Sequence, residues 1–342
     1  MRSRHCNWCC HDIGECEGMN AWVETIEVVV HEAAGGTDDT RVLRLARQDG
    51  APLPAYRPGA HVDVYLPNDL VRQYSLCGPN PQASDYRIAV KRSSESRGGS
   101  AWLCSHAGNG TQLRIGLPRH AFGVDETAAH HILVAGGIGV TPVLSMAYAL
   151  QASGKSFQFE YFVRSEADTV FRDEIMRSPL AAHTRIHPAL APDAVRERVA
   201  ALLAESKPQS HLYVCGPAAL MQMTAELARA ALGDGNVHME AFGPMAPAEA
   251  GEREFVVKLG SCSTAVVVPP ARSVLACLRD AGHEIGSSCE VGVCGSCMMR
   301  VIEGEPDHRD SYLTDDERMA GTHFLPCVSR SKSPVLVLAR DT

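Results

Sequence analysis

Four cysteines near the carboxyl end of this 342-residue chain constrain its fold more than any other feature. Cys289, Cys294 and Cys297 lie within nine residues, and Cys327 follows after 29 more. This spacing is that of a plant-type [2Fe–2S] cluster, in which closely spaced thiolates converge on a small centre and intervening glycines let the backbone bend. The alternatives are small buried apolar side chains or a zinc site, but zinc prefers two closely spaced pairs and the second pair is missing.

The cellular setting agrees with metal ligands rather than disulfides. The start of the chain has no apolar core typical of a secretory signal, which predicts a cytoplasmic protein whose thiols stay reduced. The net charge of −8 disfavours nucleic acid as a partner, and the apolar runs are too short to predict a membrane span.

The first half of the chain has the pattern of a small antiparallel β-barrel, because short strand-like segments alternate with Gly, Pro, Asn and Asp. A helix is expected to start near Ala101, after the last of these strands. The predicted strands are Ile26–Val30, Val42–Leu45, His61–Leu66, Tyr74–Cys77 and Arg87–Lys91.

From His131 the pattern changes to alternating strands and helices, which predicts a parallel sheet with helices on both faces. The predicted segments are strand His131–Ala135, helix Pro142–Ala152, strand Phe157–Arg164, helix-like Asp168–Met176, strand His183–His187, helix Pro192–Glu205, strand His211–Cys215 and helix Ala218–Leu232.

The segment 244–253 lacks any periodicity and is predicted to be a linker. Strands Glu254–Leu259 and Thr264–Val268 and helix Ser273–Ala281 follow it, before the cysteines. We therefore predict a barrel at 20–124, an α/β domain at 125–243 and a cluster domain at 254–342. Residues 1–19 are expected to be a disordered, dispensable tail; a metal site there and a true start at Met19 are the alternatives.

A glycine turn links the first strand of the α/β domain to its helix. Gly136, Gly137 and Gly139 let the backbone approach a pyrophosphate, and the helix N-terminus favours its negative charge. Pro142 suits a first helical turn, but it occupies the third glycine position of the dinucleotide fingerprint, so that fingerprint is absent.

Two barrel segments contain residues that suit a phosphate and an aromatic ring system, although the first of them alone is also typical of an ordinary strand. An arginine can pair with a phosphate, an aromatic side chain and a hydroxyl can border a ring system, and consecutive glycine N–H groups before a helix form an anion nest. The segments are Arg72-Gln73-Tyr74-Ser75 and Arg97-Gly98-Gly99-Ser100.

With these motifs together, the chain from about Met19 resembles the phthalate dioxygenase reductase and vanillate O-demethylase reductase family. The resemblance implies a multidomain protein: an antiparallel β-barrel flavin domain, an α/β parallel-sheet nicotinamide domain, and an α+β β-grasp ferredoxin domain. It implies FMN rather than FAD, because the chain between Gly99 and Leu117 is too short for an adenine-binding segment.

The resemblance also implies roles for individual residues. Ser75 would hydrogen-bond the flavin N5, and Thr141 would reach towards the flavin. The segment Cys215-Gly216-Pro217 would border the nicotinamide, with Cys215 packing there rather than acting as a nucleophile. Phe242 would cover the flavin ring, unless it is a core residue. The strand Ala89-Val90-Lys91 would line the flavin.

Cofactor preference is left open by Arg164 and Ser165, which follow the second strand of the α/β domain, where NADPH needs a cationic or hydroxyl pair. The resemblance favours NADH. No acid–base pair is nominated, because cofactors carry the hydride and the electrons.

The implied function is the reductase of a Rieske-type aromatic oxygenase or demethylase, acting as a monomer with a separate terminal oxygenase. Alternatives are a reductase of the same build for a di-iron hydroxylase or a cytochrome P450, and a non-catalytic redox sensor. Cys104 and His106 lack the second half of a Rieske motif and are interpreted as fold residues. The acidic segment Glu303–Glu317 is either a docking face or a solvated loop. The substrate of the oxygenase is not encoded in this chain.

Overall fold

The structure is a computed structural model. The tail at 1–19, most of the linker, Arg97, Cys289 and Cys294 fall outside the residues that it describes. Those described are 24–67, 70–79, 84–93, 98–120, 122–242, 253–260, 265–270, 272–283, 285–287, 290, 292, 295–310, 312–313 and 315–340.

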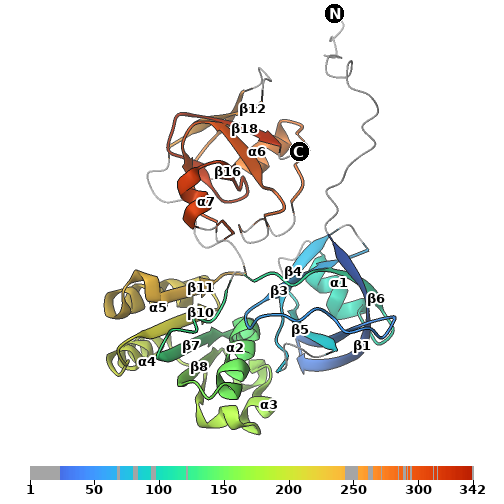
Figure 1. The fold of residues 1–342 in the computed structure, drawn as a ribbon, viewed down its shortest axis with the longest axis vertical. Helices are drawn as coiled ribbons and strands as arrows, with labels where there is room; N and C mark the ends of the chain where they lie inside the picture. The colour runs from blue at the N-terminus through green and yellow to red at the C-terminus, as the bar shows by residue number, and fades with distance from the viewer. Residues whose placement is uncertain are drawn as a thin grey trace, which may run out of the picture.

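The first domain is an antiparallel sheet in the order β4-β3-β6-β1-β2-β5, as the barrel prediction requires (Figure 1). Alternate side chains such as Val28, Leu43 and Ile88 are fully or almost fully buried and form its core, because successive strand residues point to opposite faces. The elements are β1 Thr25–Thr37, β2 Thr40–Arg47, β3 His61–Tyr65, β4 Val71–Ser75, β5 Asp85–Lys91, α1 Gly99–His106 and β6 Gln112–Gly116.

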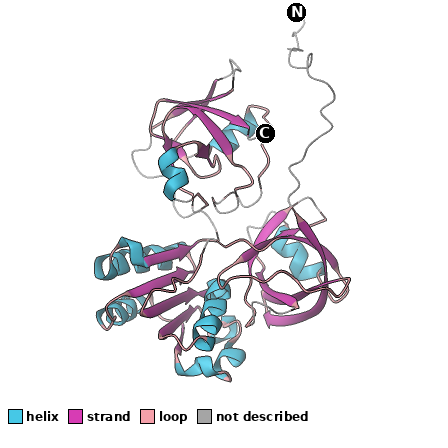
Figure 2. Ribbon diagram, viewed as in Figure 1, coloured by secondary structure: helices cyan, strands magenta, loops and turns pink. Residues whose placement is uncertain are grey.

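The second domain is a parallel sheet in the order β11-β10-β7-β8-β9. Helix α2 packs on one face, where Val143 and Leu144 join its core, and helices α4 and α5 pack on the other through Leu202 and Met221 (Figure 2). The prediction of helices on both faces is confirmed. The elements are β7 His130–Gly136, η1 Gly137–Gly139, α2 Val140–Ala152, β8 Phe157–Val163, η2 Glu166–Asp168, α3 Arg172–Met176, η3 Pro179–Ala182, β9 Thr184–Pro188, α4 Pro192–Ala204, β10 Ser210–Cys215, α5 Ala218–Leu232, η4 Asp234–Asn236 and β11 Val237–Glu240.

One predicted helix of this domain is wrong in its extent. The helix-like segment 168–176 divides into the short η2 and α3, separated by residues 169–171. Phe171 has a left-handed backbone, with φ of 63°, which cannot continue a right-handed helix.

The third domain is a mixed sheet in the order β13-β12-β18-β14-β16, with helix α6 contributing Leu275 and Leu278 to its core. The Ser273 side chain caps α6 by accepting a hydrogen bond from the Ala276 N–H at 3.1 Å. The elements are β12 Phe255–Leu259, β13 Ala265–Val268, α6 Val274–Asp280, β14 Met299–Glu303, β15 Pro306–Asp307, α7 Asp315–Ala320, β16 His323–Phe324, β17 Arg330–Ser331 and β18 Val335–Arg340.

The first two domains contact each other through α2, which lies at their boundary (Figure 1). The Gly59 N–H of the barrel donates to Ser145 Oγ of α2 at 2.8 Å, and both groups are buried. Within the part of the chain that the structure describes, no helix combines the length and apolar character needed to cross a membrane.

Candidate cofactor sites

A cavity of about 620 Å³ lies at the carboxyl ends of the parallel strands. The glycine turn 136–139 and the segment 216–221 form its walls, Leu190 and Pro192 lie at the β9 end, and Phe242 lies at the β11 end. In open α/β sheets this edge is where ligands bind, and the size suits a dinucleotide-like molecule. The structure therefore places both predicted nucleotide motifs in one cavity.

The glycine turn is held against the neighbouring strand by backbone packing. A side chain on Gly139 would place its Cβ 2.3 Å from the Cys215 carbonyl oxygen. Thr141 is buried and its hydroxyl donates to the Ile138 carbonyl at 3.0 Å, which closes the turn. Cys215 is fully buried, and burial raises the pKa of its thiol well above the usual value. A protonated thiol is a poor nucleophile, which agrees with a packing role.

The part of the cavity that follows β8 contains a carboxylate, that of Asp168, which was not predicted from the sequence. Arg164 and Asp168 both line the cavity there. The Ser165 hydroxyl donates to Asp168 Oδ2 at 2.9 Å. The hydroxyl considered for a 2′-phosphate is therefore engaged with a carboxylate, which disfavours a second negative charge.

The two barrel segments predicted to hold a flavin phosphate lie against each other. A Cβ on Gly99 would be 2.8 Å from Arg72 Cγ and 2.9 Å from its Nε. Gly98, with φ of 105°, precedes the first turn of α1. Arg72 and the glycine turn are therefore in contact with each other, and together they have the groups that bind a phosphate.

Ser75, at the end of β4, meets an acidic residue of the second domain. Its Oγ lies 3.5 Å from Glu240 Oε2, and His61 Nδ1 lies 3.8 Å from Glu240 Oε1. Burial raises the pKa of Glu240 to about 8 and lowers that of His61 to about 4, so both groups are uncharged at neutral pH. Glu240 and His61 were not predicted as site residues, because they come from strands of different domains.

The nucleotide cavity is lined by Lys91 of the barrel as well as by Phe242 of the α/β domain. Lys91, predicted to line the flavin, lines this cavity and pairs with Asp39 through a 3.2 Å Nζ–Oδ2 contact. Phe242 has 47% of its surface exposed and lines the same cavity, so it is not a core residue. A ligand in the cavity therefore meets both domains.

The third domain buries the two cluster cysteines that the structure describes. Cys297 and Cys327 are 3% and 8% exposed and belong to the same apolar core. Gly295 has φ of 70°, and a Cβ there would lie 2.3 Å from the Tyr312 ring. Two buried thiols beside a positive-φ glycine fit a cluster wrapped by the backbone.

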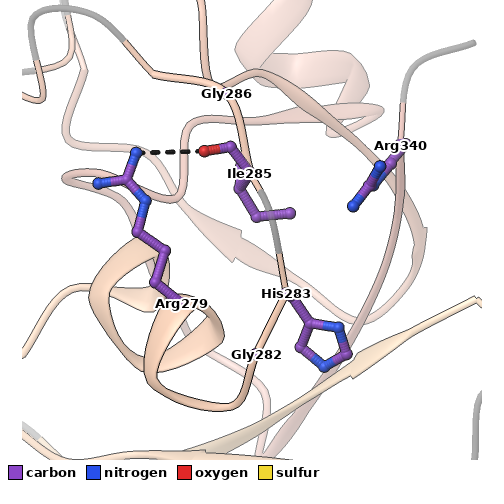
Figure 3. A pocket seen from close by; sticks show the side chains of 6 residues that line it. All are labelled: Arg279, Gly282, His283, Ile285, Gly286 and Arg340. Atoms are coloured by element: carbon purple, nitrogen blue, oxygen red, sulfur yellow. Dashed lines mark hydrogen bonds between the residues drawn. The ribbon is translucent and has the colours of Figure 1, made fainter.

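Arg279 of α6 supports the segment on both sides of Cys289. Its guanidinium donates to the Ile285 carbonyl at 3.1 Å, to Ser287 Oγ at 2.6 Å and to Glu290 Oε1 at 2.9 Å. Figure 3 shows the first of these bonds beside a cavity of about 720 Å³, which His283 and Arg340 also line. Helix α6 therefore positions the segment that enters the cysteine loop.

The acidic segment 303–317 makes ion pairs both within itself and with Lys332 near β17. Glu305 pairs with Lys332 at 3.3 Å and Asp307 with Arg309 at 2.8 Å. Asp310 is buried and accepts a backbone hydrogen bond from Leu313 at 2.9 Å. These contacts favour a structured loop over a purely solvated one.

The interpretation of Cys104 and His106 as fold residues agrees with their contacts. Cys104 Sγ lies 3.5 Å from the Val90 carbonyl, and His106 stacks on Trp102 with ring centroids 5.5 Å apart.

Comparison with known proteins now identifies the domains. Residues 257–332 match the family model described as a 2Fe-2S iron-sulfur cluster binding domain, and residues 133–226 match the oxidoreductase NAD-binding domain. Over the whole chain, the phthalate dioxygenase reductase of Burkholderia cepacia is 41% identical, with 86% of this chain and 91% of the relative covered. The chain belongs to the phthalate dioxygenase reductase family.

Further relatives support the family. The vanillate O-demethylase oxidoreductase of Pseudomonas sp. (strain HR199) is 38% identical over 92% of this chain and 99% of its own length. A solved structure of phthalate dioxygenase reductase, described as modular for electron transfer from pyridine nucleotides to [2Fe–2S], has a TM-score of 0.69 at 38% identity, covering 92% and 98% of the two chains. This chain is thus an oxidoreductase with the FMN, NAD and [2Fe–2S] modules of that family.

One structural relative is a different class of enzyme. An intact type IV self-sufficient cytochrome P450 monooxygenase has a TM-score of 0.75 at 34% identity, covering 92% of this chain but 41% of that protein. The same three modules thus occur inside a longer protein of another activity.

Proposed function

We propose that this protein is the reductase component of a Rieske-type aromatic oxygenase or demethylase, which takes hydride from NADH and delivers single electrons to the oxygenase. The observation that carries the proposal is that Lys91 of the barrel and Phe242 of the α/β domain line one nucleotide cavity. A nicotinamide bound there lies at the junction of the two domains, where hydride transfer to a flavin is direct.

The α/β domain binds and orients the nucleotide. The turn Gly136, Gly137 and Gly139 offers backbone N–H groups to the pyrophosphate at the start of α2. Pro142 sets the first turn of that helix. Gly216 and Pro217 lie directly against this turn, so a side chain on Gly216 would collide with Gly136. Asp168 favours NADH over NADPH by its charge.

The barrel holds FMN. Arg72 and the turn of Gly98, Gly99 and Ser100 bind the phosphate, with Arg97 completing that turn in the sequence motif. Tyr74, Gln73 and Ser75 border the ring, and Ala89 borders it from β5. The neighbouring Val90, predicted to line the flavin, instead points into the barrel core. Thr141 reaches the flavin from the first turn of α2, and Cys215 packs beside the nicotinamide.

Cys289, Cys294, Cys297 and Cys327 are the proposed cluster ligands. When bound, FMN would supply the chemistry that accepts a hydride and releases single electrons, and the cluster would supply a one-electron acceptor. Gly295 and Arg279 hold the loop in the shape that the four thiolates require.

The test uses two electron acceptors in the purified holoprotein with NADH. Ferricyanide takes electrons from the flavin, whereas cytochrome c needs the cluster. We expect Cys294→Ser to keep ferricyanide reduction and lose cytochrome c reduction. Cys277→Ser, a buried cysteine of the same domain outside the motif, is the matched control and keeps both. A flavin-loaded protein that does not oxidise NADH contradicts the proposal.

A cytochrome P450 is the second candidate acceptor, because the structural relative with the TM-score of 0.75 is a P450 monooxygenase. Coupled turnover with a purified Rieske oxygenase and with a purified P450 distinguishes the two partners.

We also propose that the protein works as a monomer in the cytoplasm, where thiols remain reduced. Sedimentation measures the oligomeric state, and cell fractionation measures the location.

A further inference from the structure

Arg87 is a buried charge at the junction of the two domains that the proposed electron path does not use. It lies on β5, where Tyr86, Ile88 and Val90 point into the barrel core. Because strand side chains alternate, Arg87 points to the other face with Ala89 and Lys91. Arg87 is 6% exposed, and a buried guanidinium is retained only where it is paired.

The partners of Arg87 come mainly from the second domain. Its Nη1 and Nη2 donate to Glu174 Oε2 and Oε1 at 2.8 and 2.9 Å, which is a bidentate pair. The guanidinium also lies over the Phe171 ring, 4.7 Å from the centroid. The Tyr148 hydroxyl donates to the same carboxylate from α2.

One further bond ties this pair to the flavin motif. Arg87 Nη2 donates to the Cys77 carbonyl at 2.5 Å, two residues after Ser75. Arg87 is also two residues before Ala89 and four before Lys91, which lines the nucleotide cavity. The guanidinium is therefore rigidly placed relative to the barrel side of the cofactor sites.

The other side of the pair comes from segments that also reach the nucleotide cavity. Tyr148 belongs to α2, the helix that begins directly after the glycine turn. Phe171 and Glu174 follow Asp168, which lines the cavity. The left-handed backbone of Phe171, with φ of 63°, is a strained conformation that places its ring beneath Arg87.

We propose that Arg87 is a positioning residue for hydride transfer, which through Glu174 fixes the nicotinamide domain on the flavin barrel. The inference rests on the proposed function. The Gly59–Ser145 hydrogen bond and the contacts of Glu240 with Ser75 and His61 also join the two domains, so their relative rotation is restricted. Hydride transfer requires this accuracy, because a displacement of about 1 Å lowers such rates by about 100-fold.

The test compares Arg87→Met, Arg87→Lys and Glu174→Gln in the holoprotein. Arg196→Met is the matched control, because it breaks an exposed ion pair with Glu226 within the α/β domain. Stopped-flow absorbance measures flavin reduction by NADH, and the long-wavelength absorbance of the mixed protein and NADH reports nicotinamide–flavin stacking. Calorimetry with ADP measures the nucleotide site alone, and FMN and cluster contents are measured from the absorbance spectrum.

We expect flavin reduction to fall about 10- to 100-fold in Arg87→Met, with a weaker long-wavelength band. Affinity for ADP stays within about twofold and FMN content is unchanged. Arg87→Lys gives an intermediate rate, because an ammonium keeps the charge but not the bidentate geometry. Combining Arg87→Met with Glu174→Gln costs no more than Arg87→Met alone, because both changes break one pair.

Two results overturn the inference. One is that the variants keep both the rate of flavin reduction by NADH and the intensity of the long-wavelength absorbance band. The other is loss of FMN or of ADP affinity in proportion to the rate, which would make the pair a stability element only. If Arg87→Met does not fold, Glu174→Gln decides, since it keeps the volume and one acceptor. Failure of the proposed function is recognised separately, as no flavin reduction by NADH in the unaltered protein.

Discussion

The turn around Gly139 and the loop around Gly295 both require glycine, but for different reasons. Gly139 has an ordinary helical backbone, with φ of −60°, and is excluded from carrying a side chain by the carbonyl of Cys215. Gly295 has φ of 70° and is covered by the ring of Tyr312, which is 37% exposed. A strand carbonyl cannot move away, whereas a half-exposed ring can. The nucleotide site is therefore expected to be the less tolerant of the two.

The largest expected effect is that of Gly139→Ala. The added methyl group must separate the turn from β10, which removes the backbone N–H groups from the pyrophosphate. We expect ADP affinity to fall about 100-fold, on the scale of the loss of several charge-assisted hydrogen bonds. Calorimetry measures it, and Gly235→Ala, in the same domain but outside the cavity, is the control because its Cβ meets no atom within 4 Å. Equal losses in both variants would mean that close approach is not the cause.

A smaller effect is expected for Gly295→Ala. The left-handed backbone costs about 1–2 kcal/mol for a residue with a Cβ. The cluster is then released at a lower temperature, which visible absorbance records during heating. Adding Tyr312→Ala removes the steric contact and leaves only the backbone cost. If that double variant releases its cluster as early as the single variant, the ring contributes nothing.

Arg279→Met tests the support of the cysteine loop from α6. Three hydrogen bonds are lost, but the side chain of Arg279 is 40% exposed, so solvent replaces part of their contribution. We expect cluster loss to a chelator to accelerate severalfold. Arg272→Met, which breaks an exposed pair with Asp280, is the control. No difference between the two variants would contradict a supporting role.

A separate effect, on stability rather than on ligand binding, is the pH dependence expected from Glu240. The pKa of this carboxyl rises from 4.5 to about 8 in the folded protein, so the folded state holds the proton more tightly than the unfolded chain. Its contribution to stability is complete below pH 4.5 and is lost as the pH rises towards about 8. Glu240→Gln should remove that loss, as measured by melting temperature against pH. Glu226→Gln, an exposed change, should leave the profile unaltered.

The sequence was most informative where neighbouring residues do one task. The cysteine spacing, the glycine turn and the strand alternation are local patterns, and they predicted the domain order. The segments at Arg72 and Gly99 were assigned separately to one phosphate, and the structure brings them together.

Contacts between domains could not be predicted in this way. Arg87 and Glu174 are 87 positions apart, and His61 and Glu240 belong to different sheets. No local pattern marks such pairs. The left-handed residue Phe171 likewise interrupts the predicted helix-like segment 168–176, and no local pattern marked it.

The burial of Cys215 has a consequence for the working life of the protein. Reduced flavins pass electrons to oxygen, so peroxide would form close to the buried thiol of Cys215. Only a thiolate reacts readily with peroxide, and burial keeps the pKa of Cys215 high. We expect mass spectrometry after peroxide treatment to find Cys104, which is half-buried, oxidised before Cys215. We therefore expect Cys215 to stay reduced over many turnovers.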